Sequence, residues 1–267
     1  LRPIREYAII QPMAWDPDIY LTFARPRFRP ALDLLQRITL DTPSHIVDLG
    51  CGTGNATPLM RQRWPDARIT GVDGSPDMLA RAREAHPDVT TWMEADIAEW
   101  SPDEAPDLVF SNATLQWLND HETLFPRLLS KLVPGGQLAV QMPRNYLEPG
   151  LALVNETALD GPWQANLAAI VRSIPVQEPA YYYRLLRPKV AELDIWESNF
   201  IHVLEGDNPV ADWTKGAWMS PLLAALDDPE RSEYEAEYRR RVALAYPKEP
   251  DGTTLFPFQR MFFVATV

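Results

Sequence analysis

The chain has 267 residues, a formal net charge of −12 and a single cysteine. This length suits one α/β domain with insertions. The negative charge would repel a nucleic-acid backbone, so we expect a small-molecule or protein partner and no nucleic acid. The lone Cys51 excludes an intramolecular disulfide and fits a reducing compartment, so a cytoplasmic location is predicted.

Membrane insertion and metal binding are also disfavoured. A membrane-spanning helix needs about 18 consecutive apolar residues, and the chain contains no such stretch. The histidines are scattered, and neither H-x-x-x-H nor C-x-x-C spacing occurs, so no metal site is expected. The composition leaves the oligomeric state open.

The beginning of the chain resembles neither a leader sequence nor part of the fold. Asp16 and Asp18 follow the first apolar run too closely for a signal peptide. Met13 begins Met-Ala-Trp-Asp-Pro, which looks like a natural start. We therefore expect residues 1–12 to be an extension or tag, and residues 13–267 to form a single domain.

Strands and helices then alternate along the chain. Helices are predicted at residues 31–37, 57–64, 75–85 and 124–132. Strands are predicted at residues 45–49, 67–73, 89–95, 106–111, 137–142, 195–204 and 258–267. Such alternation indicates right-handed βαβ units, so the fold class is α/β, with a Rossmann-like, doubly wound, seven-stranded and mostly parallel sheet.

Two segments interrupt this pattern, near residues 144–190 and 207–250. The first is rich in proline and contains Tyr181-Tyr182-Tyr183, whereas the second shows helical periodicity. Loops at the carboxyl edge of a parallel sheet usually determine substrate specificity. We expect both segments to be helical insertions that form a substrate lid.

A glycine loop follows the first predicted strand, with the pattern Asp48-x-Gly50-x-Gly52-x-Gly54. Without Cβ atoms, such a loop can adopt positive φ, approach a ligand closely and point its amides at an acceptor. A dinucleotide fingerprint would need its third glycine at position 55, where the chain has Asn55. The pattern resembles motif I of the class I S-adenosylmethionine-dependent methyltransferases, which implies this cofactor and an antiparallel last strand.

Acids at the ends of the next two strands extend this cofactor site. Asp73 lies where a carboxylate accepts hydrogen bonds from both ribose hydroxyls. Asp96 and the Ile97 amide can bind the adenine edge, while Met78 or Trp100 packs on the base. The cofactor-binding residues that we expect are Arg29, Asp48, Gly50, Gly52, Asn55, Asp73, Gly74, Met78, Asp96, Ile97 and Asn112.

The segment after the fourth strand contains Gln116 and Trp117. Enzymes that methylate amino groups of bases resemble one another here through Asn/Asp-Pro-Pro-Tyr/Phe, and this motif is absent. We expect Gln116 and Trp117 to face the transferred methyl group and to be the catalytic residues. By composition alone, Trp117 is equally well explained as a core residue.

Several further blocks narrow the resemblance to the trans-aconitate methyltransferases. They are Asp16-Pro17-x-x-Tyr20-Leu21-x-Phe23, Arg27-x-Arg29-Pro30-Ala31, Asn112-Ala113-x-Leu115-Gln116-Trp117, Gln141-Met142-Pro143-x-Asn145-x-Leu147-Glu148-Pro149, Ala180-Tyr181-Tyr182 and Phe256-Pro257. The resemblance implies methylation of one carboxylate of trans-aconitate. Where that family carries Gly-Leu-Arg-Pro, this chain has Trp218-Met219-Ser220-Pro221, so an anion-binding arginine is missing or replaced.

A polycarboxylate substrate needs local cations, because the net charge is negative. The substrate-binding residues that we expect are Tyr20, Arg27, Arg144, Tyr146, Tyr182 and Arg260. Arg260 is the strongest of these because it interrupts an otherwise apolar strand, although any one of the arginines is equally compatible with a solvated surface. Three alternatives stay open: a methyltransferase for another polycarboxylic acid or a quinone ring carbon, an NAD- or nucleotide-sugar-binding oxidoreductase, and a non-catalytic cofactor-binding protein.

Overall fold

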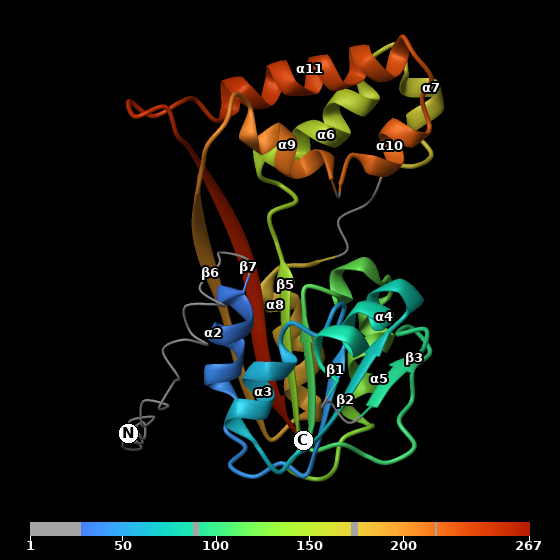
Figure 1. Ribbon diagram of the computed structural model, residues 1–267, viewed down its shortest axis with the longest axis vertical. Coiled ribbons are helices and arrows are strands. Elements are labelled where there is room, and N and C mark those ends of the chain that lie inside the picture. The colour runs from blue at the N-terminus through green and yellow to red at the C-terminus, as the bar shows by residue number, and fades with distance from the viewer. Residues whose placement is uncertain (1–27, 88–90, 172–175, 217) are drawn as a thin grey trace.

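The computed structural model describes residues 28–87, 91–171, 176–216 and 218–267. The features predicted before residue 28, including the extension at 1–12, Met13, Tyr20 and Arg27, lie outside the described residues. The described chain forms a sheet with helices on both faces and a group of helices above the sheet (Figure 1).

The sheet has seven strands in the order β3-β2-β1-β4-β5-β7-β6. The strands are β1 (His45–Leu49), β2 (Arg68–Asp73), β3 (Thr91–Glu94), β4 (Leu108–Asn112), β5 (Gln137–Pro143), β6 (Glu192–Leu204) and β7 (Thr254–Thr266). Strands β1 to β5 pair in parallel, and β7 is antiparallel to both β5 and β6. The predicted doubly wound, mostly parallel sheet with an antiparallel last strand is confirmed.

Apolar side chains cover both faces of the sheet. On one face, α2 (Arg29–Arg37) and α3 (Thr57–Arg63) share a core with alternate residues of β1, β4 and β7. On the other face, α5 (His121–Leu129) and α8 (Pro179–Leu186) pack on the remaining residues of the same strands. A central parallel strand buried on both faces is uniformly apolar, which explains the run Ile46-Val47 before Asp48.

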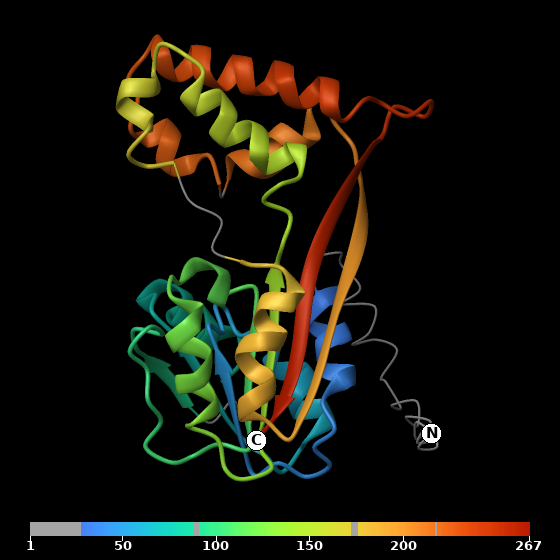
Figure 2. The same ribbon diagram turned by 180° about the vertical axis from the view of Figure 1, so that it is seen from behind.

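Another group of helices lies apart from these layers, above the upper end of β5 (Figure 2). They are α6 (Pro149–Leu159), α7 (Gln164–Leu167), α9 (Pro209–Lys215), α10 (Ser220–Ala224) and α11 (Glu230–Ala245). Their shared core includes Phe256 and Phe258 at the start of β7, so the long β6–β7 pair connects this helical group to the sheet. Among the described helices, none combines the length and apolarity needed to cross a membrane.

The helical group occupies the positions of the predicted insertions, with one difference. Helix α4 (Pro76–Ala85), which Ser75 caps by accepting from the Met78 amide, belongs to the regular alternation as predicted. Helix α8, however, falls inside the segment 144–190 and packs on the sheet with α5. Closure of the insertions over a ligand stays a prediction.

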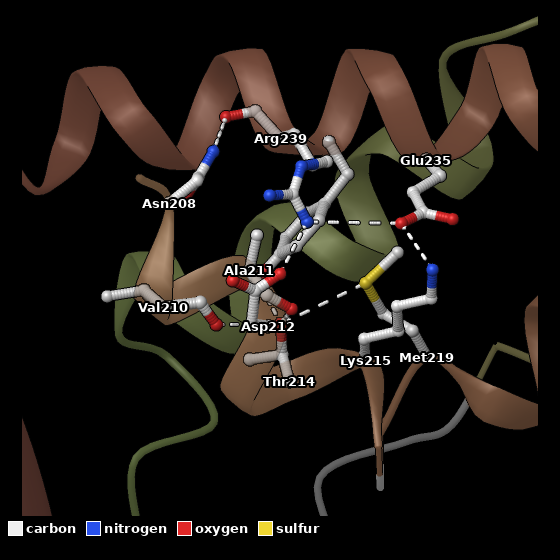
Figure 3. A network of polar contacts seen from close by, with 10 residues as sticks. Asn208, Val210, Ala211, Asp212, Thr214, Lys215, Met219, Glu235 and Arg239 are labelled. Atoms are coloured by element: carbon white, nitrogen blue, oxygen red, sulfur yellow. Dashed lines mark hydrogen bonds and ion pairs between the residues drawn. The ribbon is translucent and has the colours of Figure 1, made fainter. Parts of the chain in front are cut away.

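Polar contacts join α9 to α11 inside the helical group (Figure 3). The Thr214 hydroxyl lies 2.7 Å from the Tyr238 hydroxyl, which donates to the Gly150 carbonyl at 2.8 Å. Asn208 Nδ2 donates to the Arg239 carbonyl at 2.7 Å. Tyr238 therefore links three helices through one buried hydroxyl.

Removing this hydroxyl is expected to destabilise the protein. In Tyr238→Phe, the Gly150 carbonyl loses a donor in a buried site, so we expect the free energy of unfolding to fall by about 1–3 kcal/mol. Urea denaturation measures this change. Tyr183→Phe is the matched control, because Tyr183 is 55% exposed and its hydroxyl can bind water. Equal stability of the two variants would contradict the assigned role.

Candidate functional site

The glycine loop after β1 has the backbone that the sequence predicts. Gly50, Gly52 and Gly54 have φ of +79°, +56° and +76°. A Cβ on Gly50 would collide with the side chain of Thr114, which follows β4. Glycine is therefore required here both by the backbone angle and by the close approach of a neighbouring segment.

Three amides of the loop bind the end of β2. The amides of Gly50 and Cys51 donate to the Val72 carbonyl at 2.7 and 3.0 Å. The Gly52 amide donates to the Asp73 carboxylate at 2.8 Å. These three amides therefore find their acceptors within the protein, and they fix the loop against β2.

A cleft of about 800 Å³ opens beside this loop at the carboxyl edge of the sheet. Most of the predicted cofactor residues line it, namely Asp48, Gly50, Gly52, Asn55, Asp73, Met78, Ile97 and Asn112. Gly74 and Asp96 are chain neighbours of lining residues, but neither lines the cleft itself.

The two predicted nucleoside-binding acids are differently placed. Asp73 accepts from the Gly52 amide and, at 2.9 Å, from the Ser75 amide. A carboxylate has about four acceptor positions, so Asp73 retains capacity for two hydroxyls. Asp96 is exposed and accepts from the Ala98 amide at 2.9 Å. These positions fit a ribose against Asp73 and a base near Ile97.

Asp48 is the most unusual group in the cleft. Its side chain is 2% exposed, and its Oδ2 has no hydrogen-bond partner among the described residues. Burial, followed by the charge of Asp73, raises the pKa of Asp48 to about 7. Burial and the same carboxylates raise the pKa of the Cys51 thiol, so this thiol stays protonated and is no nucleophile.

A second, smaller cavity of about 110 Å³ lies between the sheet edge and the helical group. Gln116, Asn145 and Tyr146 line it together with apolar and aromatic side chains. Trp117 lines both this cavity and the cofactor cleft, and its ring centroid lies 5.9 Å from that of Trp218. The two predicted catalytic residues therefore stand where the two cavities meet.

Several buried polar atoms near the carboxyl edge of the sheet have no described partner. They are Asn112 Oδ1, Gln116 Oε1, Gln141 Nε2, Asn145 Nδ2 and Oδ1, and Arg260 Nε. Gln116 and Asn145 line the second cavity, and Asn112 lines the cofactor cleft. Buried polar groups are normally hydrogen-bonded, so these atoms are available to a polar ligand or to water. Gln141 and Asn145 were not among the predicted site residues, although both lie where β5 reaches the carboxyl edge.

Arg260 on β7 belongs to this cluster. It is 7% exposed, and its guanidinium carbon lies 4.5 Å from the ring centroid of Phe258, which lines the second cavity. Burial lowers its pKa to about 10, so it remains charged at neutral pH. Among the described residues it forms no ion pair, and its Nη1 makes only a long contact, 3.5 Å, with Gln141 Oε1.

Two of the predicted arginines line neither cavity. Arg29, expected at the cofactor, lies 5.1 Å from the ring centroid of Phe200, a ring that Arg260 approaches at 5.8 Å. Arg144 forms an ion pair with Glu197 on β6 and lines neither cavity.

Tyr182 is a core residue rather than a substrate ligand. It belongs to α8 and is fully buried. Its hydroxyl lies 2.7 Å from His121 Nδ1 and accepts from the Gln177 amide. Tyr146, in contrast, lines the second cavity, with its ring centroid 5.1 Å from that of Trp218. Within the described ranges, no group of three or more potential metal ligands is found.

This sheet order, the glycine loop and the nucleoside cleft define a class I S-adenosylmethionine-dependent methyltransferase. Residues 46–136 match the family model described as "Methyltransferase domain". The phosphoethanolamine N-methyltransferase 2 of Haemonchus contortus, solved with S-adenosyl-L-methionine, has a TM-score of 0.53 at 18% identity, covering 96% of this chain and 58% of its own. Coclaurine N-methyltransferase has a TM-score of 0.50 at 14% identity, with 89% and 71% covered. These structures share the fold.

Two relatives define the family more narrowly. The trans-aconitate 2-methyltransferase of Azoarcus sp. is 47% identical over 251 residues, which cover 94% of this chain and 98% of the relative. The enzyme of the same name from Escherichia coli is 44% identical over 251 residues, covering 94% and 97%. The chain belongs to the trans-aconitate 2-methyltransferase family.

Removing the Asp73 carboxylate is expected to abolish cofactor binding. Asp73→Ala loses acceptors for the ribose and the bond that shapes the loop at Gly52, so S-adenosylmethionine affinity should fall about 100-fold or more. Isothermal titration calorimetry measures this loss. The control is Asp66→Ala, which changes an exposed acid outside the cleft. Unchanged affinity in Asp73→Ala would rule out the role.

Asp48 is expected to make the stability of the protein depend on pH. The native carboxyl holds its proton up to about pH 7, whereas an unfolded aspartic acid releases it near pH 4. Between these values the native state binds more protons, so raising the pH destabilises the parent protein. Asp48→Asn mimics the protonated form, so it should have a higher Tm than the parent at pH 8 and a similar Tm at pH 4.

The same carboxyl should link cofactor binding to pH. A cationic cofactor favours the ionised form of Asp48, so S-adenosylmethionine affinity should increase from pH 6 to 8 in the parent and stay flat in Asp48→Asn. Calorimetry across this range tests the linkage. The same slope in both proteins would contradict it.

Proposed function

We propose that the protein transfers a methyl group from S-adenosylmethionine to a carboxylate of trans-aconitate, giving a monomethyl ester. The observation that carries this proposal is the second cavity, which Trp117 shares with the cofactor cleft and which Gln116 and Asn145 line with polar atoms that have no described partner. The buried cation Arg260 packs on Phe258, which lines the same cavity. This arrangement suits a small polyanion. The names of the relatives support the same acceptor.

The lining of the second cavity suits an acceptor that needs no general base. Among the residues that the structure describes, this lining contains no histidine, acidic residue or lysine. A carboxylic acid with a reference pKa near 4 is already ionised at neutral pH, so the nucleophile exists without proton transfer. S-adenosylmethionine, when bound, supplies the methyl group on a sulfonium that is already electrophilic. The residues therefore have to hold the carboxylate oxygen in line and exclude water.

The apolar walls also favour the reaction. Trp117, Tyr146, Trp218 and Phe258 line the cavity and make its walls largely apolar. Attack by an anion on a cation removes both charges, so a poorly solvating site stabilises the transition state relative to the separated ions. This argument holds for any carboxylate acceptor of suitable shape.

The alternatives are less well supported. A quinone would leave the buried charge of Arg260 without a partner, which is costly. A nucleotide-dependent oxidoreductase would need the third glycine of its fingerprint at position 55, where this chain has Asn55, and the amides of Gly50, Cys51 and Gly52 already bind Val72 and Asp73. Another polycarboxylic acid is the strongest rival, because the same cation and carboxamides would bind it. A cytoplasmic location and the absence of a nucleic-acid partner remain predictions.

A methyl-transfer assay separates these possibilities. With methyl-labelled cofactor, we expect rapid labelling of trans-aconitate and slower labelling of cis-aconitate, citrate and isocitrate, because their carboxylates are differently arranged. Reactions without an acceptor give the background. Equal or faster turnover of another acid in this panel would reassign the substrate, and no turnover of any acid would reject carboxyl methylation.

A further inference from the structure

One short turn carries the two residues that stand between the cofactor cleft and the second cavity. Gln116 and Trp117 belong to a single 3-10 turn, Leu115–Trp117, which follows β4. Trp117 lines the cofactor cleft and the second cavity, and Gln116 lines the second cavity. The position of this turn therefore determines where both side chains lie relative to the cofactor.

The backbone on either side of the turn is strained. Ala113 before it and Asp120 after it have φ of +56° and +57°, and they are the non-glycine residues with positive φ among the described positions. Such a conformation persists only where the surroundings hold it. The Ala113 amide donates to the Gln141 carbonyl at 3.0 Å, and its carbonyl accepts from Gln116 Nε2 at 2.7 Å. These two bonds hold the beginning of the segment.

The buried side chain of His121 holds the middle of the turn. His121 is the first residue of α5 and is 5% exposed, and its Nε2 lies 3.0 Å from the Leu115 carbonyl. The same carbonyl accepts from the Leu118 amide at 3.1 Å, so both of its acceptor positions are used. The Leu118 bond closes the turn, and the His121 bond fixes it against α5.

A chain of hydrogen bonds determines which nitrogen of His121 carries the hydrogen. The Leu115 carbonyl can only accept, so Nε2 is the donor. Nδ1 lies 2.7 Å from the Tyr182 hydroxyl, which accepts from the Gln177 amide at 3.1 Å and has its own hydrogen left to donate to Nδ1. Every hydrogen of this buried chain therefore has an acceptor when His121 is neutral. Burial also lowers the pKa of His121, which favours the same form.

These contacts leave His121 no direct part in the chemistry. It lines neither the cofactor cleft nor the second cavity. Both ring nitrogens are engaged within the protein, so neither is available to a substrate. Any influence on methyl transfer must therefore pass through the turn.

We propose that His121, oriented by Tyr182, is a positioning residue for methyl transfer, because its bond to the Leu115 carbonyl holds Gln116 and Trp117 at the junction of the two cavities. The proposal rests on the proposed function and adds to it a group that acts from outside the site. Reaction rates are sensitive to such positioning, since a misplacement of about 1 Å can lower a rate by about 100-fold.

Two substitutions separate the Leu115 bond from the rest of the histidine. His121→Gln keeps an amide donor near the position of Nε2, whereas the shorter side chain in His121→Asn ends near the position of Nδ1. We expect kcat for trans-aconitate to fall by about 10- to 100-fold in His121→Asn and to be largely retained in His121→Gln. Affinity for S-adenosylmethionine should stay close to that of the parent in both variants, which also shows that each is folded.

A double-mutant cycle distinguishes positioning from general destabilisation. Gln116→Ala should lower kcat in the parent and in His121→Gln, but should cost little more in His121→Asn, where the turn has already lost its position. General destabilisation would make the two losses additive. Additive losses, equal kcat in the two His121 variants, or no loss in Gln116→Ala would each overturn the proposal.

Nuclear magnetic resonance of the histidine ring nitrogens gives a readout that needs no turnover. At pH 7 His121 should be the neutral tautomer with its hydrogen on Nε2, and its signals are identified by their absence in His121→Gln. The Nδ1 resonance should shift in Tyr182→Phe, because Nδ1 then loses its donor. A charged ring or a hydrogen on Nδ1 would contradict the assigned contacts. Failure of the proposed function has a different signature, because the parent protein would then methylate no acid while the tautomer stayed as described.

Discussion

The hydrogen bond between the Gly52 amide and the Asp73 carboxylate is the contact on which the cofactor cleft depends. Together with the bonds from Gly50 and Cys51 to the Val72 carbonyl, it ties the loop after β1 to the end of β2. The absence of a Cβ at Gly50 then lets Thr114, from the segment after β4, close against the loop. The ends of three strands converge, and the cleft lies among them.

This arrangement places two carboxylates close together in a protein of net charge −12. Asp73 is stabilised by two backbone amides, whereas Asp48 has an unpartnered oxygen in the described structure. A buried carboxylate without a partner is unfavourable when ionised. A positively charged ligand removes this penalty, so the electrostatics of the cleft favour a cation. The cost of ionising Asp48 in this buried position also makes the site sensitive to pH, as the raised pKa of Asp48 indicates.

The features that sequence predicted well are those set by local geometry. The glycine loop needs positive φ at fixed positions, and the order of strands and helices follows from periodicity, so β1 begins and ends where expected. Arg260 was recognisable because a charged residue interrupts an apolar strand. Strand β7 nevertheless begins at Thr254, before its predicted start, because Phe256 packs on the helical group rather than on the sheet.

The errors concern residues whose environment comes from distant segments. Arg144 is paired with Glu197, and Tyr182 with His121, partners contributed by other elements of the fold. Gln141 and Asn145 gave no signal as binding residues, since amides at the end of a strand are common. Only their burial without described partners distinguishes them.

The buried cation also explains how an acidic protein can select a polyanion. Its overall field repels such a substrate, so recognition has to come from a group that is unsatisfied until the substrate arrives. Arg260 meets this condition, because its guanidinium is packed against the rings of Phe258 and Phe200 with no described carboxylate beside it. An unpaired buried charge costs several kcal/mol, and an anionic substrate recovers part of that cost on binding. A neutral molecule of the same shape does not, so discrimination follows from the cost of leaving the arginine unpaired.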